Sequence, residues 1–264
     1  DDELALSIAQ LNSLGPVALS GGDTVTLQDT GAALSAMTTG EIAALAGLGV
    51  DALDASDDVL TLTLAQFNSL GAVALSDADV VTLQDTGATL SAMSVSELAA
   101  LEGAGVDALD ASDDALTFTL AQIDALGAVS LTAGDTVTVA DTGAGLAALG
   151  ATEIGALATL GVDVFDATDD QITLSAAQAV ALGAILIATG DDATVSDTAA
   201  NIQALTAAQL AAFAGGGIDR LDASDDALVL SFDQYAATSG MEFDATDSVT
   251  VEGTSGDDVF SSAN

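Results

Sequence analysis

Aspartates at a fixed spacing are the residues of this chain best suited to chemistry. The motif D-A-S-D-D occupies residues 54–58 and returns at 110–114, at 166–170 as D-A-T-D-D, and at 222–226, so each copy begins 56 residues after the last. Ca²⁺ takes about six to eight hard oxygen ligands, which closely spaced carboxylates and turn carbonyls supply. The spacing therefore predicts calcium binding, repeated along the chain.

The predicted calcium ligands are the first, fourth and fifth residues of each motif. They are Asp54, Asp57, Asp58, Asp110, Asp113, Asp114, Asp166, Asp169, Asp170, Asp222, Asp225 and Asp226. A second interpretation stays open, in which these residues only close turns and cap helices in contact with water. If the strands form one continuous ladder, equivalent turns lie about 10 Å apart and repel one another unless a cation lies among them.

Two further columns of aspartates follow the same period. One column is Asp23, Asp79, Asp135, Asp191 and Asp247; the other is Asp29, Asp85, Asp141 and Asp197, each followed by Thr and in three copies by Gly. Asp before Thr-Gly is typical of turns and of helix entry. The sequence therefore favours a structural role for both columns.

The charge balance narrows the partners. The chain has 41 acidic residues, a single base (Arg220) and a net charge of −40. Such a charge repels nucleic acid and anionic membrane surfaces, so divalent cations are the expected partners. No apolar run is long enough to insert across a bilayer. Cys is absent, which excludes disulfides and thiolate metal sites.

Catalysis has few residues to use. The chain has no His, Cys or Lys, so the usual general bases and activated nucleophiles are missing. Paired carboxylates can hydrolyse glycosides, but here the carboxylates recur along the chain, whereas an active site is one place. We therefore expect that this segment is not an enzyme.

The elements that position these residues repeat with the same period. Four full repeats cover residues 1–56, 57–112, 113–168 and 169–224, and a partial fifth begins at 225. Each repeat holds two β-α coils of about 28 residues, a length typical of β-α solenoids such as leucine-rich repeats. A lone coil cannot bury its apolar face, so we expect the coils to stack.

The second repeat shows the plan. Alternating residues predict strands at 59–62, 72–75, 80–83 and 106–111, with turns at 76–79 and 85–87. Helices are predicted to start at Thr63, with Gln66 three residues later, and at Ser94, with Glu97, because both pairs form capping boxes. Short links between strands and helices favour a parallel sheet with right-handed crossovers. The predicted fold class is therefore an α/β, right-handed parallel β-α solenoid over residues 1–252.

The pattern breaks at G-T-S-G-D-D-V-F (253–260), which resembles the first nonapeptide of the RTX proteins, the secreted calcium-binding β-roll family. Gly253, Gly256, Asp258 and Phe260 match the family pattern, while Thr254 replaces its second Gly. The resemblance implies that residues 253–264 begin a β-roll and that Asp258 is a calcium ligand. A chance Gly/Asp turn is the alternative.

The body of the chain resembles long arrays in large exported proteins of proteobacteria. The stretch D-T-G-A-T-L-S-A-M-S-V-S-E-L-A-A-L-E-G-A-G-V-D-A-L-D-A-S-D-D (85–114) and its copies carry this resemblance over nearly the whole chain. It implies a type I secretion substrate, extracellular or at the cell surface, which folds on meeting Ca²⁺. Adhesin, surface-layer and biofilm-matrix roles accompany it.

The leading hypothesis is a calcium-responsive structural or adhesive segment of a large secreted surface protein. Its chain ends fall within the repeat pattern, so we expect a piece of a longer protein. One alternative is a module whose sheet binds glycan, another surface or a copy of itself, an idea that the alternating Thr of T-L-T-L (61–64) also suits. Another is a haloadaptive acidic scaffold without specific ion sites.

Overall fold

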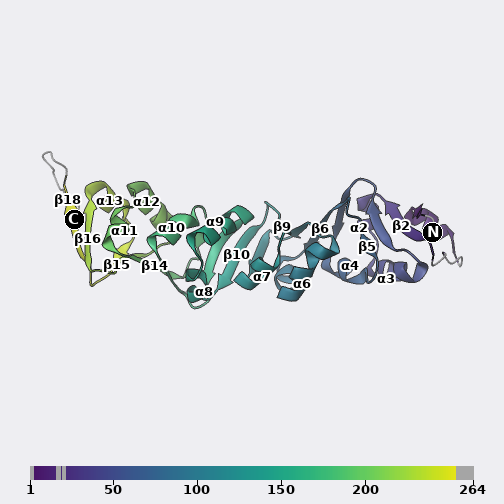
Figure 1. The fold of residues 1–264 in the computed structure, drawn as a ribbon, viewed down its shortest axis with the longest axis horizontal. Helices are drawn as coiled ribbons and strands as arrows, with labels where there is room; N and C mark the ends of the chain where they lie inside the picture. The colour runs from purple at the N-terminus through teal and green to yellow at the C-terminus, as the bar shows by residue number, and fades with distance from the viewer. Residues whose placement is uncertain (1–2, 16–18, 20–21, 254–264) are drawn as a thin grey trace. The chain divides into compact units, whose positions relative to one another are not determined.

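The computed structural model describes residues 3–15, 19 and 22–253, and the chain divides into two compact units at residues 136 and 137. Parallel strands and helices alternate along each unit (Figure 1). The boundary falls inside the third predicted repeat, 113–168, so the units do not follow the repeat boundaries.

The strands of the first unit pair in parallel in two groups. The first group runs in the order β1 (Glu3–Leu6), β2 (Thr24–Asp29), β3 (Ala52–Ala55) and β5 (Ala74–Leu75). The second runs β4 (Val59–Leu62), β6 (Val80–Asp85), β7 (Ala108–Ala111) and β9 (Ser130–Leu131). β8 (Ala115–Phe118) follows β7 in the chain.

The helices of the first unit connect these strands. They are α1 (Ile8–Ser13), α2 (Gly31–Ser35), α3 (Thr39–Leu48), α4 (Leu64–Ser69), α5 (Gly87–Ser91), α6 (Val95–Leu101) and α7 (Leu120–Ala125). A 3-10 turn, η1 (Glu102–Ala104), extends α6 as far as Gly105, whose positive φ of 82° ends the helical segment.

The second unit repeats this arrangement. Its parallel strands are β10 (Thr136–Asp141), β11 (Val162–Ala167) and β13 (Leu186–Ile187); β12 (Gln171–Leu174), β14 (Asp192–Asp197), β15 (Arg220–Ala223) and β17 (Glu242–Phe243); and β16 (Ala227–Ser231) with β18 (Ser248–Glu252). Its helices are α8 (Gly143–Ala147), α9 (Ala151–Leu160), α10 (Ala176–Leu182), α11 (Ala199–Gln203), α12 (Ala207–Gly215) and α13 (Phe232–Ala237).

Parallel strands joined by helical crossovers make each unit an α/β solenoid, which confirms the predicted fold class. Equivalent strands keep the same register, with Thr26 opposite Ala52 and Thr82 opposite Ala108. The right-handed sense of the crossovers stays a prediction from the crossover rule. The capping boxes at Thr63 and Ser94 are confirmed, because each hydroxyl accepts the N–H of the residue three positions later.

The strands do not form one continuous ladder. In β6, residues 80–83 pair with β4, whereas residues 82–85 pair with β7, so the ladder shifts sideways from one coil to the next. Each sheet of the first unit therefore ends after four strands. The spacing of about 10 Å between equivalent turns, which depends on an unbroken ladder, does not follow from this arrangement.

The main local difference from the sequence prediction is a short helix that begins at the last residue of each D-T-G or D-T-A triplet. The turn predicted at 85–87 is wrong: Asp85 ends β6, and Thr86 caps α5 by accepting the N–H of Thr89. The strands predicted at 72–75 and 106–111 are shorter, because their first residues connect a helix to the sheet. Each coil of this type therefore turns back through two helices.

The core lies between strands and helices. Alternate strand residues point inward, so Val81 and Leu83 of β6 are fully buried, as are Leu90 of α5 and Leu98 of α6. Small Ala and Gly residues elsewhere on the helices allow this close packing. The turns that join consecutive strands, such as β3 to β4 and β5 to β6, carry the repeated aspartates.

Candidate functional site

Two stacked turns bring the acidic residues together. The turn at 55–58 closes with a hydrogen bond of 2.8 Å from Asp58 N to Ala55 O, and the turn at 76–79 closes with one of 3.2 Å from Asp79 N to Ser76 O. Val80 N donates to Asp58 O at 2.9 Å, which places one turn directly on the other. We call such a pair of stacked turns, with the Asp that precedes it, an acidic corner.

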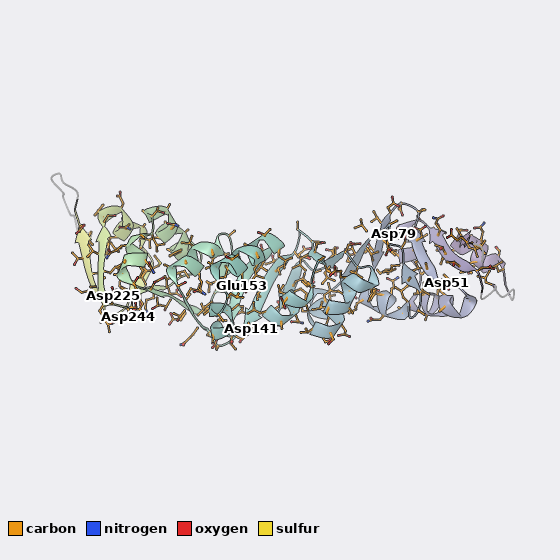
Figure 2. The ribbon with its side chains drawn as sticks, viewed as in Figure 1. Asp51, Asp79, Asp141, Glu153, Asp225 and Asp244 are labelled. Carbon is orange, nitrogen blue, oxygen red and sulfur yellow. The ribbon has the colours of Figure 1, made fainter. Side chains whose placement is uncertain are left out.

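Four acidic corners occur in the described residues, two in each unit. They comprise residues 54–58 with 76–79, 110–114 with 132–135, 166–170 with 188–191, and 222–226 with 244–247. Their turn-closing hydrogen bonds recur at 2.7–3.3 Å. Asp79, Asp225 and Asp244 are labelled in Figure 2.

The fourth residue of each motif caps a helix of the preceding coil. Asp57 Oδ1 accepts the N–H of Gly31, the first residue of α2, at 2.7 Å. The equivalent bonds are Gly87 to Asp113 at 2.6 Å, Gly143 to Asp169 at 2.7 Å and Ala199 to Asp225 at 2.8 Å. The first N–H groups of a helix lack partners within it, so this carboxylate has a structural function.

In the described part of the chain, the first and fifth residues of the motif do not cap helices: the first accepts a bond from a side chain in three copies, and the fifth has an exposed carboxylate. Gln28 donates its side-chain amide to Asp54, Gln84 does so to Asp110, and Ser196 donates its hydroxyl to Asp222 at 2.6 Å. Asp58 has a positive φ of 59°, and its three equivalents have φ of 56–59°. A short polar side chain tolerates this left-handed conformation better than most. Its carboxylate is exposed to solvent.

The column that begins at Asp23 supplies the buried member of each corner. Asp79 Oδ2 accepts the N–H of Ala55, inside the acidic motif, at 2.8 Å; the equivalent bonds are Ala111 to Asp135, Ala167 to Asp191 and Ala223 to Asp247, at 3.0, 2.8 and 2.9 Å. Only 6% of Asp79 and 8% of Asp135 is exposed. Sequence reasoning recognised this column but gave no sign of its burial, because the partner N–H is 24 residues away.

One oxygen of this buried carboxylate lacks a partner. Among the residues that the structure describes, Oδ1 of Asp79, Asp135 and Asp247 is buried and makes no hydrogen bond. Leaving an acceptor buried and unsatisfied costs about 1–3 kcal/mol, and more when it is charged. The corner therefore contains an oxygen that a ligand could satisfy.

Burial and the neighbouring acidic residues both disfavour the ionised form of this carboxylate. Burial raises the pKa of Asp79, the bond from Ala55 opposes that shift, and repulsion from Asp54, Asp58 and Asp57 raises the pKa further. The pKa values of Asp191 and Asp247 are raised in the same way, chiefly by burial. A proton or a cation is thus favoured at these carboxylates.

A threonine connects two carboxylates in the second corner. Thr132 Oγ1 lies 3.0 Å from Asp110 Oδ1 and 2.8 Å from Asp135 Oδ2. A hydroxyl has one proton and can donate it to only one of the two. A motif aspartate and the buried aspartate therefore both lie within hydrogen-bond distance of the same hydroxyl group.

The third column has the structural role that the sequence indicates. Asp85 Oδ1 accepts the N–H of Thr86 at 2.9 Å, and its Oδ2 accepts the N–H of Leu64, the first residue of α4, at 3.3 Å. Asp29 and Asp197 make the same pair of bonds. This carboxylate fixes the start of a helix in the preceding coil.

The corners are acidic but are not closed metal sites in this arrangement. Within residues 3–15, 19 and 22–253, no three acidic side chains form a ready-made metal-binding group. The predicted ligands Asp54, Asp57 and Asp58 lie close enough to Asp79 to raise its pKa, whereas Asp258 lies outside the described residues. Calcium binding therefore stays a prediction.

Comparisons with known proteins add little. No family model and no curated protein match the chain. A solved structure, the leucine-rich repeat-containing protein LegL7 from Legionella pneumophila, is 14% identical and aligns over 98% of this chain and 93% of its own, with a TM-score of 0.28. A TM-score this low carries no argument about fold or function, and the fold class rests on the strand pairing. No helix in the described part of the chain is long and apolar enough to cross a membrane.

Proposed function

We propose that this chain is a structural or adhesive repeat segment of a large extracellular surface protein, and that Ca²⁺ stabilises it. The supporting observation is the acidic corner, where motif aspartates surround a buried carboxylate that has an unsatisfied oxygen. The corner recurs through both units, as expected for a scaffold and not for a single active site. The same reasoning supports a non-enzymatic role.

Charge compensation gives the corner its function. The sequence has 41 acidic residues and one base, so its own side chains cannot neutralise the corners. Charges separated by less than the Debye length, about 8 Å at physiological salt, are weakly screened. A divalent cation relieves this repulsion in the folded state and therefore stabilises the stacked coils.

An extracellular location agrees with this chemistry. Extracellular modules bind Ca²⁺ with dissociation constants of roughly 10⁻⁴–10⁻³ M, whereas cytosolic sensors bind it far more tightly. An incompletely formed carboxylate cluster suits the weaker range. The absence of Cys and the resemblance to RTX proteins and exported repeat arrays also support secretion.

Thermal unfolding tests the proposal. The 264-residue chain is melted in CaCl₂, in MgCl₂ and in NaCl at matched ionic strength. We expect Ca²⁺ at about 100-fold excess over its dissociation constant to raise the unfolding midpoint by about 5 °C or more beyond NaCl. Equal midpoints in all three salts would instead support the haloadaptive scaffold.

A surface-binding module is the second candidate, because the first unit has an open groove of about 530 Å³. Phe67 and Asn68 of α4 line it together with Leu75, Asp77 and Gly105. Its mixture of apolar and polar groups suits a small glycan. Screening the chain on a glycan array tests this candidate, and binding that Asn68→Ala abolishes would support it.

A further inference from the structure

We infer that Asp79 and Asp135 are the central ligands of two Ca²⁺ sites in the first unit, each formed within one acidic corner. Asp54 and Asp58 complete the site of Asp79, and Asp110 and Asp114 complete that of Asp135. The inference rests on the proposed stabilisation by calcium and assigns it to particular oxygens. It also gives a binding role to a column that the sequence indicated to be structural.

In each buried carboxylate, one oxygen accepts a hydrogen bond and the other does not. Ala55 N donates to Asp79 Oδ2, and Ala111 N donates to Asp135 Oδ2, so each carboxylate is held against the motif of the stacked turn. The other oxygen, Oδ1, is buried in both residues and makes no hydrogen bond. A bound cation would satisfy this oxygen without disturbing the bond that positions the carboxylate.

Of the remaining ligands, Asp58 makes no side-chain hydrogen bond in the described residues, and Asp54 accepts one, from the side-chain amide of Gln28. Asp57 is committed to the N–H of Gly31, whereas the carboxylate of Asp58 is exposed, and none of the hydrogen bonds found in the described residues involves it. Asp58 and Asp79 belong to stacked turns, because Val80 N donates to Asp58 O. Small side-chain rotations of Asp54 and Asp58 are therefore the movement that calcium binding requires.

In the second corner, the carboxylates of Asp110 and Asp135 already share one neighbour, the hydroxyl of Thr132. Asp110 Oδ1 and Asp135 Oδ2 both lie within 3.0 Å of Thr132 Oγ1. Two carboxylates and a hydroxyl are hard oxygen ligands of the kind that Ca²⁺ accepts, and turn carbonyls and water can complete its coordination. Mg²⁺ demands a smaller, near-octahedral cage, so these adaptable corners favour Ca²⁺.

Charge favours a divalent cation over a proton. Protonating Asp79 removes one negative charge, whereas Asp54, Asp57 and Asp58 also lie close enough to act on it. A Ca²⁺ ion compensates two charges and attracts the others. The two corners of the first unit contain no base, since Arg220, the chain's single base, belongs to β15 of the second unit.

Calcium titration of variants tests the inference in the full 264-residue chain. Asp79→Asn combined with Asp135→Asn keeps an oxygen for the N–H groups of Ala55 and Ala111 and removes the charge at Oδ1. By isothermal titration calorimetry with CaCl₂, we expect two fewer Ca²⁺ ions per chain than in wild type. Asp77→Asn, which removes an exposed charge from the same turn as Asp79, should bind as many ions as wild type.

A second pair of variants covers the case in which the buried changes prevent folding, which far-ultraviolet circular dichroism reports. Asp58→Asn with Asp114→Asn alters exposed residues and keeps a side chain that tolerates positive φ. We expect it to weaken calcium affinity at two sites by roughly tenfold. Unchanged stoichiometry and affinity in the folded variants would overturn the inference.

The outcomes separate this inference from the proposed function. A wild-type chain that Ca²⁺ stabilises no more than NaCl would remove the calcium part of the proposed function, and the two sites with it. A wild-type chain that Ca²⁺ stabilises, together with Asp79→Asn/Asp135→Asn variants that respond equally, would remove only the two sites. Loss of the response in those variants, with its retention in Asp77→Asn, supports both.

Discussion

The two turns of an acidic corner use the same residue type in different ways. In the turn at 55–58, Asp57 has a helical N–H as its partner, and Asp54, which precedes that turn, accepts a side-chain amide from the neighbouring strand. In the turn at 76–79, Asp79 has one partnered oxygen and one buried oxygen without a partner. Periodicity alone therefore does not separate carboxylates that build the fold from those available to a ligand; burial and partners do.

The two units differ in how deeply this carboxylate is buried. In the first unit, Asp79 and Asp135 are more than nine-tenths buried, whereas Asp191 and Asp247 in the second are partly exposed. The corner that contains Asp247 also has a further carboxylate, Asp244, which accepts bonds from Thr246 instead. The first unit thus holds the more sheltered carboxylates.

The largest expected effect is at Gly87, whose N–H donates to Asp113 and which packs against the backbone of Ala115. A Cβ at Gly87 would lie 1.7 Å from Ala115 O, so Gly87→Ala must push the turn away from α5. We expect a loss of about 3 kcal/mol in the free energy of unfolding, measured by urea titration. Gly47→Ala is the matched control: nothing lies near its Cβ, and a gain of about 0.5–1 kcal/mol is expected.

The fourth repeat provides a natural test of this contact. It has Ala199 where the other repeats have Gly, and it keeps the bond to Asp225 at 2.8 Å. We therefore expect Ala199→Gly to change stability by less than about 1 kcal/mol. A loss for Gly87→Ala as small as this would show that the backbone accommodates the methyl group everywhere.

Gln66 makes hydrogen bonds both within its own helix cap and to the preceding coil. Replacing it tests how much the bonds to the preceding coil contribute to stability. Its side-chain amide donates to Ser35 O at 2.8 Å and Met37 O at 2.7 Å, while its oxygen completes the capping box with Thr63. Gln66→Ala should cost about 2–3 kcal/mol, because two carbonyls lose their donor. Gln10→Ala, at an exposed capping box, should cost about 1 kcal/mol. Equal losses in urea unfolding would contradict this difference.

The pH dependence of stability distinguishes the two turns directly. Because the pKa of folded Asp79 is raised above the ordinary 3.8, ionised Asp79 destabilises the fold at neutral pH. In calcium-free buffer that penalty should disappear as the pH falls through the raised pKa toward 3.8. Wild type should therefore gain stability relative to Asp79→Asn over this window.

The capping glutamates change in the opposite direction. Hydrogen bonds from Thr38 lower the pKa of Glu41, and those from Ser94 lower the pKa of Glu97, so their contribution to stability is lost as the pH falls through the lowered pKa values. They are common to wild type and Asp79→Asn and cancel in the difference. A difference that does not change with pH would contradict the assigned strain at Asp79.

The smallest effect is expected for Arg220. Its guanidinium lies 3.9 Å from Asp192 and 3.8 Å from Glu242, and both pairs are partly exposed. Arg220→Gln should change stability by less than about 1 kcal/mol at physiological salt, measured by urea titration. A larger loss would mean that this base, and not bound cations, relieves the repulsion in its surroundings.

Much of each coil follows from neighbouring residues. The helix starts at Thr63 and Ser94 could be predicted because a capping box joins residues only three positions apart. The 56-residue period and the alternation of strands and helices likewise indicate stacked parallel coils. The short helix at Gly87 was predictable in principle, since Thr86 is a good cap, but the Gly that follows favours a turn.

What only the tertiary structure decided lies between coils. Three features depend on residues 21–26 positions apart. They are the sideways shift of the ladder at β6, the hydrogen bond from Gly31 to Asp57 and the hydrogen bond from Ala55 to the buried Asp79. Sequence pattern fixes which residues recur, because period and caps are local. It does not determine which oxygen of a recurring aspartate accepts an N–H and which has no hydrogen-bond partner, because that depends on how adjacent coils pack.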